Sequence, residues 1–381
     1  MRDRADLVII GGGVVGLSLA YHLARLGFTD VVVLEQGYLC FGASGRNGGG
    51  VRQQWSTEEN IQLMKESVQM FRRLSSETGY NVWFRQGGYL FLARDAASAQ
   101  GLEANVKLQN RCGVPTRLIS PAEAQRVVPG LAPAGIQVCA YNPTDGVLFP
   151  FPAVWGMARA ATQLGVAVET FTRVTAIEAR GRQIVKVVTD RGAIATNRVV
   201  NAAGAWSVQV ARLLGVELPN KPYRHEILIS EPLKPFLDPM VSDLSDGTYF
   251  SQTMRGEICG GVSDPAEPSS METRSSLRFL ERMCRAMVRV VPTLANVRVM
   301  RQWAGFYDET PDGQPILGRV DEVDGFIQLH GFGGHGMMLA PIVGKLAAEW
   351  ILRKADHALF QRYDLGRFKR GEVQKETFSI G

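Results

Sequence analysis

A glycine-rich run, Gly11-Gly12-Gly13-Val14-Val15-Gly16, lies between two apolar segments and constrains the fold more than any other feature of the chain. The preceding segment, Leu7–Ile10, is short and continuously apolar, which is typical of a parallel strand buried on both faces. The following segment repeats apolar residues at helical spacing as far as Gly27, which ends the helix. A second apolar run, Val31–Leu34, predicts the next strand of a βαβ unit.

The glycines of this run and one acidic residue each have a physical task. Gly11 permits a tight turn, Gly13 lets a pyrophosphate approach the backbone, and Gly16 lets helix and strand pack closely. The amino end of the helix offers free N–H groups and partial positive charge to phosphates. Glu35 follows Gly11 by 24 residues and can accept hydrogen bonds from ribose hydroxyls, and its charge disfavours NADP. The pattern predicts a dinucleotide site; a tight βα turn without a ligand is the alternative.

Length and composition exclude several classes of protein. A chain of 381 residues is long enough for two domains of about 100–200 residues. The net charge of +5 is small, and aromatic residues do not interleave with basic ones, so no nucleic-acid partner is expected. The five cysteines have no CxxC spacing, which predicts neither a metal site nor disulfides and fits a cytoplasmic protein. Glycines interrupt the apolar N-terminal stretch, so no membrane span is predicted.

Further helical and strand patterns, with more glycine-rich segments, continue to the end of the chain. Residues 41–50 include five glycines, which predicts either backbone lying against a ligand or a flexible loop. Residues 220–265 have the pattern of a second sheet, and residues 308–318 that of a turn-rich loop. The order predicts an α/β fold in which a Rossmann-like domain is interleaved with a mixed-sheet α+β domain. We assign residues 1–87, 146–219 and 307–381 to the first domain, and residues 88–145 and 220–306 to the second.

Six motifs occur in one order along almost the whole chain: Gly11–Gly16, Glu35, Arg46–Gly50, Asn201–Trp206, Thr310–Gly318 and Gly331–Gly336. Together they resemble the D-amino-acid oxidase / sarcosine oxidase superfamily of FAD-dependent oxidoreductases. Within it, Gly50-Val51-Arg52-Gln53-Gln54 is similar to the β subunits of dye-linked L-proline dehydrogenases. Relatives of these subunits include subunits of heterotetrameric sarcosine oxidase.

The resemblance implies an FAD-binding first domain and a substrate-binding second domain that covers the flavin. It places the ADP part at the Gly11 motif and Glu35, the adenine near Val174, and the flavin at the loop from Arg46 and at the segment from Gly333. The implied cofactor-binding residues are Gly11, Gly13, Val14, Val15, Gly16, Glu35, Gln36, Ser44, Arg46, Asn47, Gly48, Gly49, Val174, Ala203, Gly204, Trp206, Gly305, Gly333, Gly334, His335, Gly336 and Met337.

A covalent flavin is not expected, because the stretch Leu148–Pro152 contains no histidine where heterotetrameric sarcosine oxidase attaches FMN. The FAD is therefore predicted to be non-covalent. An additional FMN at a subunit interface stays open, as does a partner subunit or another electron acceptor.

The implied reaction moves a hydride from the Cα–H of an amino or imino acid to flavin N5 and gives an imine. Arg52 is the first candidate for binding the substrate carboxylate, because a guanidinium can donate two parallel hydrogen bonds. Arg301 is a second candidate, although a strand neighbour can point outward. His335 lies among glycines beside the expected flavin, and His225 and Tyr249 lie on the predicted second sheet. A surface, core or loop-stabilising role is the alternative for each residue.

Three functional hypotheses follow from the resemblance. In monomeric sarcosine oxidases a lysine promotes the reaction with oxygen, and Ile258 occupies the aligned position, which favours a dehydrogenase of a proline-, sarcosine- or glycine-like substrate. Tyr307 stands where glycine oxidases have a substrate-binding arginine, which argues against a simple glycine oxidase. The alternatives are a self-sufficient oxidase of glycine or sarcosine type that makes hydrogen peroxide, and a non-catalytic flavin subunit that relays electrons.

Overall fold

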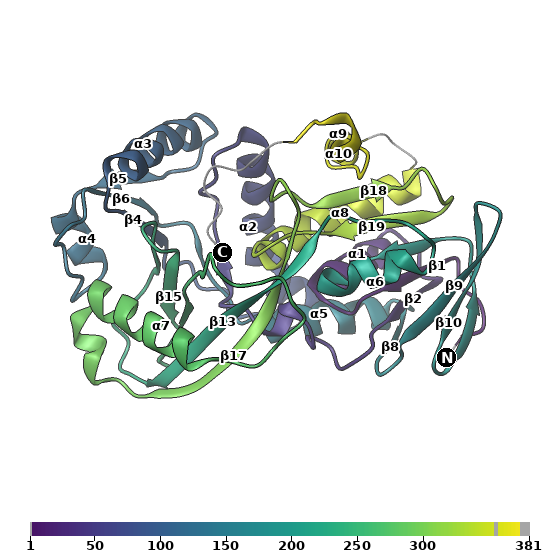
Figure 1. The fold of residues 1–381 in the computed structure, drawn as a ribbon, viewed down its shortest axis with the longest axis horizontal. Helices are drawn as coiled ribbons and strands as arrows, with labels where there is room; N and C mark the ends of the chain where they lie inside the picture. Colours follow the sequence, from purple (N-terminus) through teal and green to yellow (C-terminus); the bar gives the residue numbers. More distant parts are fainter. Residues whose placement is uncertain (1, 354–356, 374–381) are drawn as a thin grey trace.

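A six-stranded sheet, parallel except for its antiparallel edge strand, is built around the first βαβ unit (Figure 1). The structure, a computed structural model, describes residues 2–353 and 357–373. The two strands flanking the glycine run pair in parallel, and α1 (Val14–Arg25) crosses between them. The order of strands in the sheet is β18 (Ile316–Arg319), β19 (Phe326–His330), β12 (Val199–Asn201), β1 (Leu7–Ile10), β2 (Val31–Leu34) and β8 (Ala167–Glu169).

The two faces of this sheet bury alternate residues of β1 and β2. Leu7 and Ile9 pack against the helical layer of α1, α2 (Glu58–Thr78), α5 (Pro150–Gln163) and α8 (Gly336–Arg353). Val8 and Ile10 pack against the antiparallel meander β9 (Val174–Arg180), β10 (Gln183–Thr189) and β11 (Gly192–Ala195), and against α6 (Ser207–Arg212). Burial of both faces explains why the two strands are continuously apolar.

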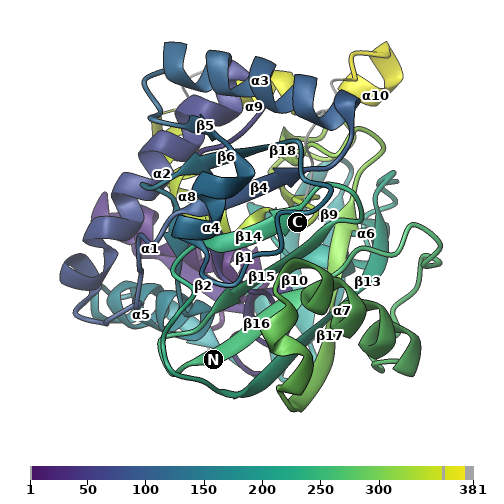
Figure 2. The ribbon, with the colours of Figure 1, turned by 90° about the vertical axis from the view of Figure 1, so that its left-hand side faces the viewer.

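A second, eight-stranded mixed sheet lies at the other end of the molecule, on the left in Figure 1 and toward the viewer in Figure 2. Its order is β17 (Val299–Glu309), β13 (Lys221–Pro232), β16 (Glu257–Gly261), β15 (Thr248–Gln252), β14 (Met240–Asp243), β4 (Tyr89–Ala93), β6 (Val138–Asn142) and β5 (Arg117–Ile119). One face packs on α7 (Leu277–Val290), whose Phe279, Met283 and Met287 lie at helical spacing in a core with Phe250 and Ile258. The helices α3 (Ala96–Arg111) and α4 (Pro121–Val127) complete this end.

Short elements connect the two sheets. Where the chain passes from one sheet to the other, β3 (Gly50–Val51) pairs antiparallel with β7 (Gly146–Val147). The remaining short elements are η1 (Ala43–Gly45), η2 (Gly204–Trp206), η3 (Pro292–Asn296), α9 (Ala358–Arg362) and α10 (Arg367–Arg370).

The predicted α/β fold with mixed sheets is confirmed, and the prediction for residues 308–318 was partly wrong. The predicted loop over 308–318 contains the start of β18, because Arg367 holds Asp312 and Gln314 and so fixes the preceding turn. The strand pairing of β13 with β17 extends through Lys221–Glu309 to Ser230–Val299, well beyond the apolar pattern, because backbone pairing continues where side chains are polar. The domain boundaries assigned from the sequence remain a proposal. Residues 374–381 of the first domain lie outside the described residues.

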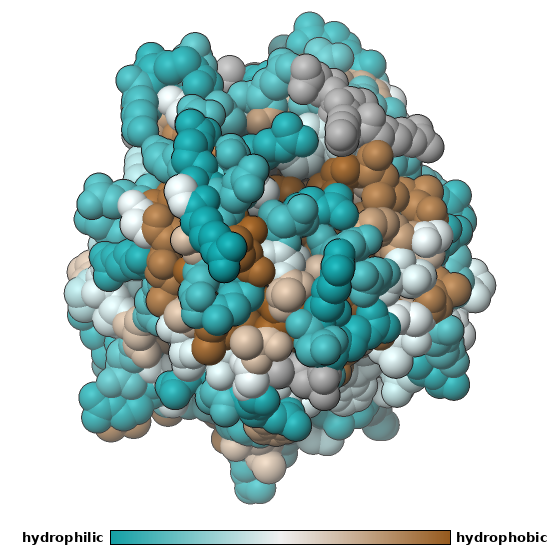
Figure 3. Space-filling model, turned by 90° about the vertical axis from the view of Figure 1, so that its right-hand side faces the viewer, coloured by the Kyte–Doolittle hydropathy of each residue, from teal (hydrophilic) through white to brown (hydrophobic). Residues whose placement is uncertain are grey.

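The surface at the end of the six-stranded sheet shows separate apolar patches between hydrophilic ones (Figure 3). None of the helices in residues 2–353 and 357–373 is long and apolar enough to cross a membrane.

Candidate cofactor and substrate site

A long cavity of about 510 Å³ runs from the glycine run at β1 to the inner face of the eight-stranded sheet. Its walls come from both sheets and from the loops that follow β1, β2, β12 and β19. All of the predicted cofactor-binding residues except Gly16 and His335 line it. Gly16 has the packing role expected of it, because a Cβ there would lie 2.1 Å from the Gly11 carbonyl oxygen.

One end of the cavity is organised by Glu35. Its carboxylate accepts hydrogen bonds from the backbone N–H groups of Gly12 and Gly37, at 2.9 and 2.8 Å. Burial raises the pKa of Glu35, and these backbone donors oppose the rise. Each carboxylate oxygen keeps a further lone pair for a ribose hydroxyl. Val174 lines the same region, as the predicted adenine position requires.

The glycines fit a long ligand that passes close to the backbone. Gly11 has φ +116°, and a Cβ there would lie 2.3 Å from the Ala202 carbonyl oxygen, so only glycine allows the turn. Gly204 and Gly333 also have positive φ, line the cavity and have no atom near a Cβ position, so side chains there would enter open space. Ser44 Oγ accepts a hydrogen bond from Val14 N–H at the start of α1. These features fit the pyrophosphate and ribityl parts of FAD.

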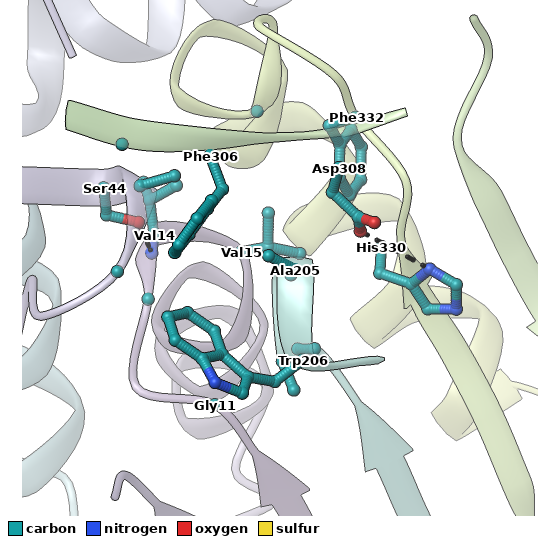
Figure 4. A pocket seen from close by; sticks show the side chains of 18 of the residues that line it. Gly11, Val14, Val15, Ser44, Ala205, Trp206, Phe306, Asp308, His330 and Phe332 are labelled. Carbon is teal, nitrogen blue, oxygen red and sulfur yellow. Dashed lines mark hydrogen bonds and ion pairs between the residues drawn. The ribbon is translucent and has the colours of Figure 1, made fainter. Parts of the chain in front are cut away.

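A carboxyl–imidazole pair, Asp308 and His330, lines the cavity (Figure 4). Asp308 Oδ2 is 3.8 Å from His330 Nδ1, and it accepts a hydrogen bond from Gly331 N–H. Asn220 donates a second hydrogen bond to Asp308. Burial raises the pKa of Asp308 to about 7 and lowers that of His330 to about 3, so the imidazole is neutral near pH 7. Trp206 and Phe306 face the same space from β12's loop and from β17.

The other end of the cavity is closed by an aromatic cluster on the eight-stranded sheet. His225 Nε2 lies 3.0 Å from the Tyr249 hydroxyl, and the His225 ring stacks on Tyr307 with centroids 4.2 Å apart. Burial lowers the pKa of His225 to about 4 and raises the pKa of both tyrosines. A Cβ at Gly261 would come within 3.0 Å of both His225 and Tyr249, so glycine is needed for their contact. The cluster therefore presents neutral polar groups to the cavity.

Arg52 and His335 lie behind the cavity wall. Arg52 is 0% exposed, and its Nη2 donates to His335 Nε2 at 2.9 Å. Because a guanidinium can only donate, that imidazole nitrogen carries no proton. Neither residue lines the cavity, whereas Gly334 and Gly336 on each side of His335 do. Arg301 is exposed on β17 and also lies outside the cavity, so the structure brings together His225 and Tyr249, and separately Arg52 and His335.

Several cavity residues were not among those predicted from the sequence. The most informative are Tyr89, Met240, Tyr307, Asp308 and His330. From the sequence, Tyr307 was treated only as a departure from glycine oxidases. Its position near the end of a strand could have indicated that it lines the cavity. Met240 lies on β14, which the sequence pattern did not reveal, and the two members of the Asp308–His330 pair come from separate strands.

Comparisons with known proteins agree with this geometry. A family model described as "FAD dependent oxidoreductase" (DAO) matches residues 6–350. The sarcosine oxidase subunit beta of Rhodobacter capsulatus is 30% identical, over 100% of this chain and 92% of the relative. The solved structure of L-proline dehydrogenase from P. horikoshii is 35% identical, with a TM-score of 0.93 over 98% of this chain and 100% of that one.

A more distant solved structure supports the fold alone. Glycine oxidase from Geobacillus kaustophilus is 24% identical and has a TM-score of 0.86, with both chains covered completely. The family model, the sarcosine oxidase subunit and the L-proline dehydrogenase structure together confirm the predicted superfamily, the FAD cofactor and the enzyme class. The chain belongs to the DAO family of FAD-dependent oxidoreductases.

Proposed function

We propose that the chain is the catalytic subunit of a dehydrogenase that oxidises a small amino or imino acid of the proline, sarcosine or glycine kind. The observation that carries the proposal is the cluster of His225, Tyr249 and Tyr307 at the closed end of the cavity. It offers uncharged hydrogen-bonding groups on an aromatic surface, which suits a small polar substrate. The relatives named for sarcosine and L-proline oxidation support this substrate class.

Bound FAD would accept the hydride that leaves the substrate Cα. The role of the chain is to bind and orient the substrate above it and to exclude water. His225 is neutral above a pH of about 4, so it can accept a hydrogen bond from the substrate amine. Tyr249 keeps its proton across the same range, because burial raises its pKa, and can donate a hydrogen bond to the substrate carboxylate.

In this proposal Arg52 attracts the substrate carboxylate through its positive charge and does not contact it directly. Its guanidinium donates to the Gln54 carbonyl oxygen at 2.7 Å and to His335, and it hydrogen-bonds to the Tyr89 hydroxyl. Tyr89 lines the cavity, and Arg52, which does not, interacts with the Tyr89 hydroxyl. A substrate carboxylate would meet Tyr89 first, with the buried positive charge behind it.

The dehydrogenase assignment needs a different argument from the one that the sequence suggested. Ile258 is buried in the core beneath α7 and does not line the cavity, so its identity carries no information about oxygen. The cavity-lining residues among those described include no lysine, and this supports a dehydrogenase. A self-sufficient oxidase remains the second candidate and is decided by the experiment below.

The test is anaerobic reduction of the purified, FAD-loaded protein. L-proline, sarcosine and glycine are added separately without oxygen, and the flavin absorbance is recorded. Bleaching by at least one of them is expected, with slow recovery when air is admitted. Fast recovery with formation of hydrogen peroxide would identify an oxidase. No bleaching by any amino or imino acid would contradict a catalytic role and favour an electron-relay subunit.

An exposed aromatic cluster supports a partner that receives the electrons. Trp83, Phe149 and Trp155 are 38%, 40% and 40% exposed, and Phe151 connects the last two. Trp83 stacks on Phe149 and has φ 52°, a strained value for a bulky residue. Phe151 lies 3.1 Å from a Cβ position at Gly45, next to the loop that lines the cavity. This surface, named the aromatic platform, suits a partner subunit or an interface FMN.

A cytoplasmic location is part of the same proposal. All five cysteines are free, which agrees with a reducing compartment. Retention of activity without an oxidising step, in protein kept fully reduced during purification, would agree with it; a requirement for oxidation would not.

A further inference from the structure

Two buried groups of opposite charge lie behind the closed end of the cavity. Arg52 and Asp145 are both 0% exposed. They are connected by Gln54, whose carbonyl oxygen accepts from Arg52 and whose side-chain amide donates to Asp145 Oδ2 at 3.1 Å. Burying an ionised carboxylate is costly unless donors surround it, so this arrangement calls for an explanation.

Every hydrogen bond to the Asp145 carboxylate comes from an N–H donor, as an ionised carboxylate requires. Oδ1 accepts from the Gln53 backbone at 2.8 Å, from the Gln53 side chain at 3.1 Å and from Asn142 at 2.8 Å. Burial raises the pKa of Asp145 to about 7, and these donors and Arg52 oppose the rise. Above that pH the group is mainly an anion.

Asp145 also ties three crossings between the two sheets. Gln53 follows β3, Asn142 ends β6, and the Asp145 carbonyl oxygen accepts from Gly88 N–H just before β4. The Gln54 amide donates to the Tyr89 carbonyl oxygen as well. The carboxylate thus fixes the segment that carries Arg52 against the strand that carries Tyr89.

Arg52 is held in one orientation by this segment and by aromatic rings. Its Cζ lies 4.5 Å from the Trp55 ring centroid and 5.7 Å from that of Phe91. Its other partners, His335 and Tyr89, connect it to the start of α8 and to the cavity wall. A positive charge in a dry environment acts strongly on a neighbouring cofactor, because little water screens it.

We propose that Asp145 is a positioning residue for the flavin: it fixes Arg52 behind the cavity wall and offsets part of its charge, and so sets how readily the flavin accepts electrons. The inference rests on the proposed function only for the position of the flavin ring at the closed end of the cavity. Removing the negative charge should make the flavin easier to reduce. Removing the positive charge should make it harder to reduce.

The test compares Asp145→Asn and Arg52→Gln with the wild-type holoprotein at about pH 8.5, where Asp145 is ionised. Sulfite is titrated against the oxidised flavin, and its affinity is measured by loss of flavin absorbance. We expect about tenfold tighter sulfite binding in Asp145→Asn and about tenfold weaker binding in Arg52→Gln, the scale on which a unit charge about 12 Å away acts at an effective dielectric constant of about 20. The flavin midpoint potential should move in the same two directions.

Asp243→Asn is the matched control. Asp243 is a buried carboxylate at the end of β14 in the eight-stranded sheet, is paired with Arg94 and Arg289, and does not line the cavity. It should lose stability without a change in sulfite affinity. Equal sulfite affinity in wild type and Asp145→Asn, or equal changes in Asp145→Asn and Asp243→Asn, would overturn the inference.

Arg52→Gln keeps the inference testable if Asp145→Asn does not fold, since an unchanged or tighter sulfite affinity in that variant would also contradict it. The outcome is separate from that of the proposed function. Sulfite and a chemical reductant need no amino-acid substrate, so the inference can fail while L-proline still bleaches the flavin, and can hold while no amino acid does.

Discussion

At the scale of single residues, the hydroxyl of Tyr249 is expected to contribute to substrate oxidation and not to FAD binding. Tyr249→Phe removes the contact with His225 but keeps the ring that packs near Gly48. Anaerobic flavin reduction should slow about tenfold, the value of one hydrogen bond to a charged group, with the FAD content unchanged. Tyr141→Phe is the control, because its hydroxyl bonds to Gly87 outside the cavity. Equal rates in wild type and Tyr249→Phe would contradict the assigned role.

Asp308 should make the stability of the apoprotein depend on pH. Its folded pKa of about 7 lies above the ordinary value of 3.8, so the folded state binds the proton more tightly than the unfolded state. Its favourable contribution is complete below about pH 4 and is lost as the pH rises through about 7. Relative to Asp308→Asn, wild type should therefore gain stability on acidification, by about 4 kcal/mol at most. Urea unfolding midpoints across this range measure the difference, and parallel curves would refute it.

Single residues also mark the limit of sequence reasoning at the site. Gly11 and Glu35 could be predicted because local backbone geometry fixes their tasks within one βαβ unit. The surroundings of Arg52 could not, because its partners Tyr89 and His335 and the linked Asp145 come from distant segments. An arginine looks like a carboxylate ligand in a sequence whether its guanidinium faces a cavity or lies behind its wall.

At the scale of elements, the junction of β3 and β7 should be intolerant of a side chain at Gly49. This residue has φ +71°, and a Cβ would lie 2.0 Å from the Leu148 carbonyl oxygen. Gly49→Ala should lose several kcal/mol of stability and most of its FAD, because the same loop lines the cavity. Thermal unfolding and the ratio of flavin to protein absorbance measure the two effects.

Gly27→Ala is the matched control for this prediction. Gly27 has φ +83° but has no atom within 4 Å of a Cβ position. It should lose only the cost of the left-handed conformation, about 1–2 kcal/mol, and keep its FAD. Equal losses in the two variants would show that strain alone, and not the clash at the junction, determines the result.

The sequence predicted strand bounds correctly for β1 and β2, in which every residue is buried. The continuous apolar runs of β1 and β2 matched their observed bounds, since both faces are covered. The polar half of β13 and the short β14 did not stand out, because their pairing is decided by neighbours far away in the chain. Hydrogen-bonded partners at such distances leave no periodic signal.

At the scale of the whole molecule, substrate oxidation and electron export should be separable. The variant Trp83→Ala/Phe149→Ala alters the aromatic platform but no residue that lines the cavity. Anaerobic reduction by substrate should keep its wild-type rate, while transfer to a partner subunit or an artificial acceptor should slow severalfold. Leu118→Ala, at a partly exposed apolar side chain on β5 that does not line the cavity, serves as the control. Slower reduction by substrate in the double variant would show that the platform supports the catalytic site itself.

The interleaving of the two sheets could be predicted only in outline. The order of motifs indicated that the chain returns to the first sheet after each excursion, and the six-stranded sheet does draw on segments from all parts of the chain. The cavity between the sheets depends on how they face each other, and no single segment encodes that.

The contacts of Glu35 have a consequence for the kinetics of cofactor loading. Its carboxylate holds Gly12 and Gly37, and its backbone carbonyl oxygen accepts from Thr172, so protein groups alone fix this turn. We expect these hydrogen bonds to shape the adenosine end before FAD binds. Reconstitution of stripped protein should follow second-order kinetics with a rate proportional to FAD concentration, and should not be limited by a slow rearrangement of this loop.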